Sequence, residues 1–147
     1  MISVFLGGTC NQSTWRDELL TMLDQDKVKA FNPVVDDWNE EAQINEDWHK
    51  ANDDFCLYVL TPEMTGIYSI FEVADDSNKR PDRTIFCVLP ERNGKTFSIG
   101  LQKNFLKIEK DLIRNGAKGC ESLEEMAMFL NTYELQHSNS NLSKVYK

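Results

Sequence analysis

The sequence predicts an α/β domain built around a parallel β-sheet, and two observations lead to this prediction. Four short runs of continuous apolar residues are typical of strands that are buried on both faces. Between them lie segments with the capping residues and apolar periodicity of helices, so strands and helices alternate along the chain. At 147 residues the chain has the length of one domain. We expect a single domain over 1–136 and a loose Ser/Asn-rich tail over 137–147.

The strands are predicted from apolar runs that stop at turn-forming residues. Glycine or proline follows each of the four runs within two residues and favours a turn there. The predicted strands cover residues 2–6, 28–31, 55–60 and 84–89, with a short edge strand over 117–120. The predicted helices follow a cap at Ser13 or Thr14, cover 45–52, 69–77 and 99–115, and run from the capping box of Ser122 and Glu125 to about Leu135.

This alternation favours a flavodoxin-like parallel sheet of four or five strands with helices on both faces. Right-handed crossover connections leave few other topologies for such a chain. In sheets of this kind, ligands bind in the crevice outside the carboxyl ends of the strands. That rule brings four segments together around one crevice: residues 7–10, 32–39, 61–69 and 90–94.

Composition excludes several classes of function. The net charge of -8 would repel a phosphate backbone and no basic patch offsets it, so we expect no nucleic-acid partner. No apolar run approaches the roughly 20 residues of a membrane-spanning helix, and no basic segment precedes the first strand as in a signal peptide. Four cysteines without CxxC spacing or a recognisable histidine partner indicate reduced thiols in a cytoplasmic protein. We expect no metal and no cofactor.

Two of the crevice segments have both a structural and a functional interpretation. Gly7-Gly8-Thr9 is either a structural turn or a close backbone approach to a sugar or phosphate. Asp36-Asp37-Trp38 is either a solvated acidic loop or a contact in which the indole stacks on a base and a carboxylate accepts its hydrogen bonds.

Glu72 is an acid among residues that favour burial. It is either the last residue of a capping box that begins at Ser69 or a catalytic carboxylate. Glu46 and Asp47 lie on the preceding predicted helix, so one of them can meet Glu72 over the crevice. Paired carboxylates suit glycosidic chemistry, because one attacks the anomeric carbon while the other handles the proton.

Several motifs follow one another at a regular spacing over residues 2–90. They are ISVFLGGT at 2–9, WR at 15–16, FNP at 31–33 with DW at 37–38, Asp54 with FCLYVLTP at 55–62, and SIFE at 69–72. As a set, they resemble the nucleoside 2-deoxyribosyltransferase-like family. The resemblance implies that Glu72 forms a covalent deoxyribosyl intermediate. The family's second carboxylate, an aspartate, falls near Glu46, where this chain has Glu46 and then Asp47, so the assisting acid stays open among these two and Asp37.

The resemblance also implies a substrate, a nucleoside or nucleotide cleaved or transferred at its N-glycosidic bond. The implied catalytic residues are Glu72, Glu46 and Asp47, and the implied substrate contacts are Gly7, Gly8, Thr9, Asn32, Asp37, Trp38, Met64 and Ser69. A homo-oligomer is implied as well, because transferases of this family complete the site with a neighbouring subunit, including a C-terminal segment. Tyr146 lies near the end of this chain, but we expect a loose tail there instead.

Three other functions are alternatives to the transferase. A 5′-monophosphate N-glycosidase, which is a hydrolase, would bring cations or hydroxyls to the start of the first helix. A non-catalytic nucleotide-binding module would keep the pocket without turnover. A receiver domain is disfavoured because Gly7-Gly8 follows the first strand where an acidic cluster would be needed.

Overall fold

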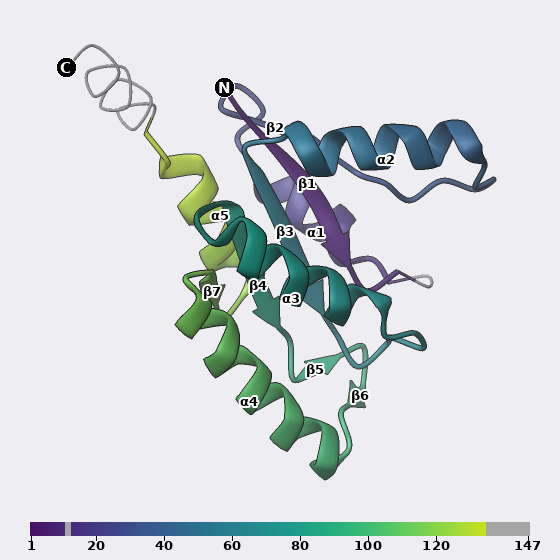
Figure 1. Cartoon of the computed structure of the whole chain (residues 1–147), viewed down its shortest axis with the longest axis vertical. Helices are drawn as coiled ribbons and strands as arrows, with labels where there is room; N and C mark the ends of the chain where they lie inside the picture. Colours follow the sequence, from purple (N-terminus) through teal and green to yellow (C-terminus); the bar gives the residue numbers. More distant parts are fainter. Residues whose placement is uncertain (11–12, 135–147) are drawn as a thin grey trace.

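The computed structural model describes residues 1–10 and 13–134, and its centre is a five-stranded parallel sheet (Figure 1). The strand order is β2-β1-β3-β4-β7. The bounds are Ile2–Gly8 for β1, Val28–Phe31 for β2, Phe55–Leu60 for β3, Thr84–Val88 for β4 and Lys118–Cys120 for β7. The predicted flavodoxin-like α/β fold is therefore confirmed. The tail expected over 137–147 lies outside the described residues.

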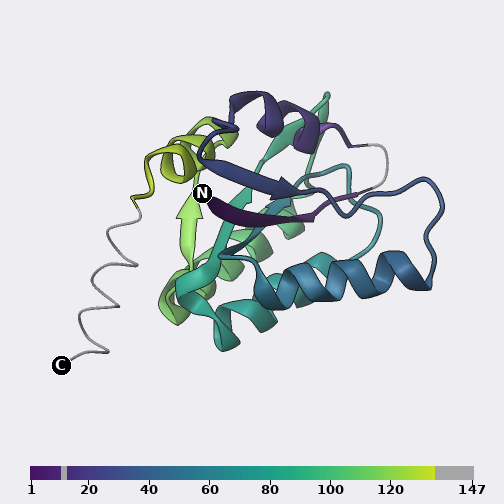
Figure 2. The ribbon, with the colours of Figure 1, turned by 90° about the horizontal axis from the view of Figure 1, so that it is seen from above.

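Helices cover both faces of the sheet. Helices α1 (Trp15–Met22) and α5 (Leu123–Thr132) lie on one face, above the sheet in Figure 2. Helices α2 (Glu40–Asn52), α3 (Tyr68–Lys79) and α4 (Ile99–Asn115) lie on the other face. A short 3-10 helix, Pro81–Arg83, precedes β4, and a small hairpin of β5 (Glu91–Arg92) and β6 (Lys95–Thr96) follows it. No helix in these described ranges is long and apolar enough to cross a membrane.

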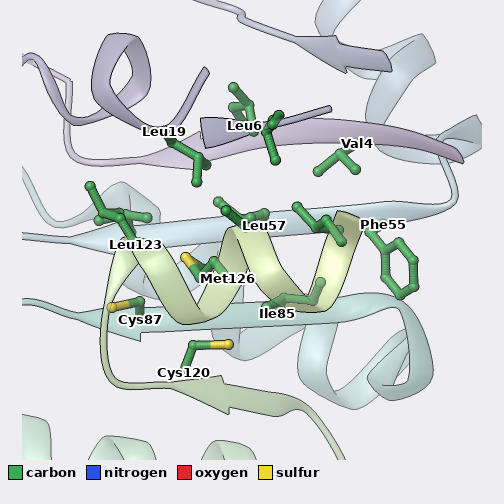
Figure 3. Packing of buried hydrophobic residues seen from close by; sticks show 14 of the residues in the cluster. Val4, Leu6, Leu19, Phe55, Leu57, Ile85, Cys87, Cys120, Leu123 and Met126 are labelled. Atoms are coloured by element: carbon green, nitrogen blue, oxygen red, sulfur yellow. The ribbon is translucent and has the colours of Figure 1, made fainter. Parts of the chain in front are cut away.

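Alternate residues of each central strand enter two different hydrophobic clusters. On the α1 and α5 side, Leu57 of β3 packs with Leu19 and Met126, as Figure 3 shows from close by. On the opposite side, Tyr58 and Leu60 of the same strand pack in a cluster with residues of α3 and α4. Because β3 is buried along its whole length, its sequence is apolar at every position rather than at every second one.

The element boundaries differ from the predicted ones where caps and turns decide them. Helix α2 begins at Glu40 instead of residue 45, since the Asn39 side chain accepts a 2.8 Å hydrogen bond from the Ala42 amide. Strand β1 continues through Gly7-Gly8, which pair with Tyr58 and Val59 of β3. Helix α5 ends at Thr132, three residues before the predicted end. The hairpin β5–β6 was not predicted, because strands of two residues carry no hydrophobic period.

The strand order places a topological switch point between β1 and β3. The chain leaves β1 toward β2 on one side, and leaves β3 toward β4 and β7 on the other. The connections therefore diverge at the carboxyl ends of β1 and β3, and a crevice opens between them. Gly8 ends β1 and Leu60 ends β3 at this crevice.

Candidate active site

A cavity of about 270 Å³ lies at the switch point, slightly smaller than the roughly 300–1,000 Å³ typical of small-molecule sites. It is formed by the end of β1, the middle of α2, the loop after β3 and the first turns of α3. Its lining consists of Gly8, Thr9, Cys10, Glu46, Met64, Gly66, Tyr68, Ser69 and Glu72. A larger cavity of about 520 Å³ lies beside α4, with Phe97 and Phe105 in its mainly apolar lining. We place the candidate site in the smaller one, because it lies at the switch point and is lined by Glu46 and Glu72.

The two glycines at the end of β1 are required by packing. Gly8 has a φ of +115°, and a Cβ atom there would lie 2.2 Å from the Val59 carbonyl oxygen. A Cβ atom on Gly7 would lie 2.5 Å from the Tyr58 ring. Gly7 therefore packs against the Tyr58 ring, while Gly8 and Thr9 line the cavity. The Thr9 side chain is buried, and its hydroxyl oxygen accepts a 2.9 Å hydrogen bond from the Thr61 amide.

Arg16 lies buried beneath this turn, a role that sequence reasoning missed. Only 3% of it is exposed, and its guanidinium donates to the carbonyl oxygens of Leu6, Gly8 and Thr9. Trp15 donates from its indole nitrogen to the Thr9 carbonyl at 2.7 Å. Burial lowers the pKa of Arg16, although the contact with Cys10 and then the charges of Glu46 and Glu72 oppose the shift. The hydrogen bonds of Trp15 and Arg16 thus fix the backbone of the turn.

Glu72 reaches the cavity from the second turn of α3. Its Oε2 atom accepts a 2.6 Å hydrogen bond from Nζ of Lys50, and only 11% of its side chain is exposed. The capping box considered for Ser69 and Glu72 does not form. The N-cap of α3 is Ile67 and makes no side-chain capping bond, so Ser69 lies inside the helix. The carboxylate is instead directed across the crevice toward α2.

Glu46 reaches the same cavity from α2 and is electrostatically coupled to Glu72. The pKa of Glu46 is raised, first by burial and then by the negative charge of Glu72. Lys50 and a hydrogen bond from the Trp38 side chain act in the opposite direction. The neighbouring Asp47 is exposed, and it accepts a 2.8 Å hydrogen bond from Gln43 on its own helix.

The structure brings six of the predicted site residues to the cavity wall, namely Gly8, Thr9, Glu46, Met64, Ser69 and Glu72. Others lie outside it. Asn32 is exposed and its side chain accepts from the Val34 amide at 3.0 Å, while Asp37 is also exposed. Trp38 is 60% exposed and approaches the site only through Glu46. Cys10, Gly66 and Tyr68 line the cavity although no role had been predicted for them.

The site carries the groups for acid–base and nucleophilic chemistry at one carbon atom. Glu72 and Glu46 each place a carboxyl group in the cavity, and the pKa of Glu46 is raised by burial and by the charge of Glu72. Among residues 1–10 and 13–134, no group of three or more His, Cys, Asp and Glu side chains is placed to hold a metal ion. Paired-carboxylate glycosidic chemistry requires two carboxyl groups in one site, and Glu46 and Glu72 line the same cavity.

Comparison with known proteins identifies the family of the chain. The family described as nucleoside 2-deoxyribosyltransferase like matches residues 1–91, which include β1 to β4 and every residue that lines the cavity. No curated protein matches the chain closely enough to be counted as a relative.

Proposed function

The chain belongs to the nucleoside 2-deoxyribosyltransferase-like family, and from this premise we propose that it cleaves or transfers the N-glycosidic bond of a 2-deoxynucleoside. The observation that carries the proposal is the pair of acids in one cavity. Glu46 and Glu72 come from two different helices, line the same cavity and lie close enough for the charge of one to raise the pKa of the other.

The proposed reaction consists of two displacements at C1′. Glu72 attacks C1′ as the bond to the base breaks, and the departing base nitrogen takes the electron pair of that bond and a proton from Glu46. A second base or water then attacks C1′ of the glycosyl ester, Glu46 takes up the proton, and Glu72 leaves as a carboxylate. Two inversions retain the configuration at C1′.

The start of α1 favours a substrate without a 5′-phosphate. The Ser13 hydroxyl donates to the carboxylate of Glu63 at 2.5 Å, so an acid already occupies this helix start. The guanidinium of Arg16 is directed to backbone carbonyls, and Arg92 is paired with Glu18 at 2.6 Å. In the described part of this region, each of these cations already has a partner. We therefore favour a nucleoside transferase over a 5′-monophosphate hydrolase.

Base release from a panel of 2-deoxynucleosides and their 5′-monophosphates tests the proposal. Chromatography would follow the free base, with and without an added acceptor base. We expect turnover of nucleosides, formation of a new nucleoside when the acceptor is present, and a loss of at least about 10³-fold in Glu72→Gln. Glu109→Gln is the matched control, because Glu109 is also a partly buried glutamate on a helix, but it lines the other cavity.

Other outcomes of this assay assign the site differently. Turnover of the monophosphates alone would identify a hydrolase or transferase of nucleotides. Tight binding without base release in the wild-type protein would identify a non-catalytic binding module. Release that survives in Glu72→Gln would exclude Glu72 as the nucleophile.

We also propose that the protein is a cytoplasmic homo-oligomer. Ile67, Tyr68 and Phe71 expose 79%, 68% and 58% of their surface at the start of α3, beside the cavity, and Trp48 of α2 is 57% exposed. A second copy that packs on these side chains would bury them and close the mouth of the site. Four free cysteines fit a reducing compartment. Light scattering after size-exclusion chromatography tests the assembly, and Phe71→Asp is expected to shift it toward the monomer.

A further inference from the structure

Lys50 forms an ion pair with the carboxylate to which the proposed function assigns the attack on C1′. Its Nζ atom lies 2.6 Å from Oε2 of Glu72, and 20% and 11% of the two side chains are exposed. Lys50 stands on the last turn of α2, one turn after Glu46 on the same helix. The charge of this ammonium group acts on both acids, and the group donates a hydrogen bond to Glu72.

The backbone of Lys50 is anchored by contacts outside the cavity. Its carbonyl oxygen accepts a 2.6 Å hydrogen bond from Nη1 of Arg80 and a 3.5 Å contact from the Cys56 thiol. Arg80 is in turn paired at 2.6 Å with Asp76, which is buried on α3. These contacts tie the end of α2 to α3, so the ammonium group is held in place relative to Glu72.

We propose that Lys50 is a positioning residue that gives the two acids different roles. By holding Oε2 of Glu72, it leaves Oε1 as the atom that attacks C1′ and leaves Glu46 as the group that carries the proton. This inference rests on the proposed function, and Lys50 itself is absent from the cavity wall. It acts on the substrate through Glu72.

The charge states of the neighbouring groups support this division. Burial alone would lower the pKa of Lys50, but the hydrogen bond and the charge of Glu72 outweigh it, so the pKa is raised and the ammonium persists. The pKa of Glu46 is raised by burial and by the charge of Glu72. The positive charge of Lys50 and the raised pKa of Glu46 therefore belong to different neighbours of Glu72.

The two displacements respond to Lys50 in opposite ways. In the first step, Oε1 forms a bond to C1′ while the base leaves, so Glu72 loses the negative charge that Lys50 stabilises. In the second step the bond from Oε1 to C1′ breaks, its electron pair returns to Glu72, and the charge beside Lys50 is restored. Lys50 thus favours the departure of Glu72, and its removal slows the second step more than the first.

Rapid-quench kinetics with a 2-deoxynucleoside and an acceptor base separates the two steps. For Lys50→Met we expect the burst of free base to rise toward one per subunit, and the steady-state rate to fall by about 10- to 100-fold. Lys50→Arg should restore turnover, since it keeps a cationic donor. Lys79→Met is the matched control, because Lys79 pairs with Asp75 at 2.9 Å on the solvent side of α3. Circular dichroism would verify that all three variants are folded.

Three results would overturn the inference. The first is a folded Lys50→Met protein whose burst and steady-state rate equal those of Lys79→Met. The second is an equal loss in both steps, which indicates a merely structural role. The third is a wild-type protein without any base release, which overturns the proposed function and the inference together. It differs from the other two because it concerns the wild type.

Discussion

The backbone of Gly8 lies so close to that of Val59 that a Cβ atom on Gly8 would come within 2.2 Å of the Val59 carbonyl oxygen. Because Gly8 also has a φ of +115°, Gly8→Ala introduces both a clash and backbone strain. We expect it to lower the free energy of unfolding by at least about 2 kcal/mol, measured by chemical denaturation. Gly100→Ala is the control. A Cβ atom there meets nothing within 4 Å, and we expect a change of about 1 kcal/mol or less toward higher stability.

A buried hydrogen-bond network of Tyr58, Asp76 and Arg80 leads to a second prediction. The Tyr58 hydroxyl donates to Asp76, which is 2% exposed and also paired with Arg80 at 2.6 Å. Asp76→Ala leaves the Arg80 guanidinium without its carboxylate partner and should cost about 3–5 kcal/mol of stability. Asp75→Ala removes an exposed pair on the same helix and should cost at most about 1 kcal/mol. Equal losses for the two variants would show that the buried network does not stabilise the fold.

The raised pKa of Glu46 predicts how its removal affects stability at different pH values. Burial and the charge of Glu72 disfavour the ionised form in the folded protein. The folded state therefore loses stability as pH rises from the unfolded pKa through the higher folded pKa, and the full penalty remains above it. Glu46→Gln should be more stable than the wild type at pH 7, and this difference should vanish near pH 4. Denaturation at both pH values tests this, with Asp47→Asn as the exposed control.

The reactivity of the four cysteines gives a fourth prediction. Burial raises the pKa of Cys56 and Cys87 to about 12 and that of Cys120 to about 11, while Cys10 is exposed at the cavity. Iodoacetamide should therefore add one group to the native protein, at Cys10, and none to Cys10→Ser. Bound nucleoside should slow the reaction. Intact mass spectrometry measures the adducts, and rapid labelling of a second cysteine would contradict the described packing.

The fold could be predicted because its signals are local. The bounds of β2 and β3 agree with the prediction, since each strand is one apolar run between turn residues. The start of α2 was missed because its first turn is acidic and exposed, and only the cap at Asn39 marks it. The capping box at Ser69 matched a local pattern, yet the carboxylate of Glu72 is bound by a residue 22 positions away.

The candidate site could be predicted only at the residues that the family motifs identify. Glu46, Glu72 and the glycine turn were identified from the motifs, whereas Lys50 had no predicted role and Arg16 was considered only as a cation for a 5′-phosphate, not as a support of the turn. Both cations lie on helices, and the sequence pattern of these helices does not distinguish an exposed basic residue from a buried one. Their partners are backbone carbonyls and a carboxylate on another element, and such contacts exist only after the strands have been brought together.

In the proposed reaction, Glu72 becomes covalently bound to the sugar. Mass spectrometry after trypsin digestion tests this bond most directly. The protein would be incubated with a 2-deoxynucleoside that carries fluorine at C2′, which slows breakdown of the intermediate because positive charge at C1′ is disfavoured. Glu72 lies in the tryptic peptide 51–79, together with Glu63. We predict one glycosyl group on this peptide, located at Glu72 by fragmentation and absent from Glu72→Gln. A glycosyl group on another residue, or one that persists in Glu72→Gln, would contradict the assignment.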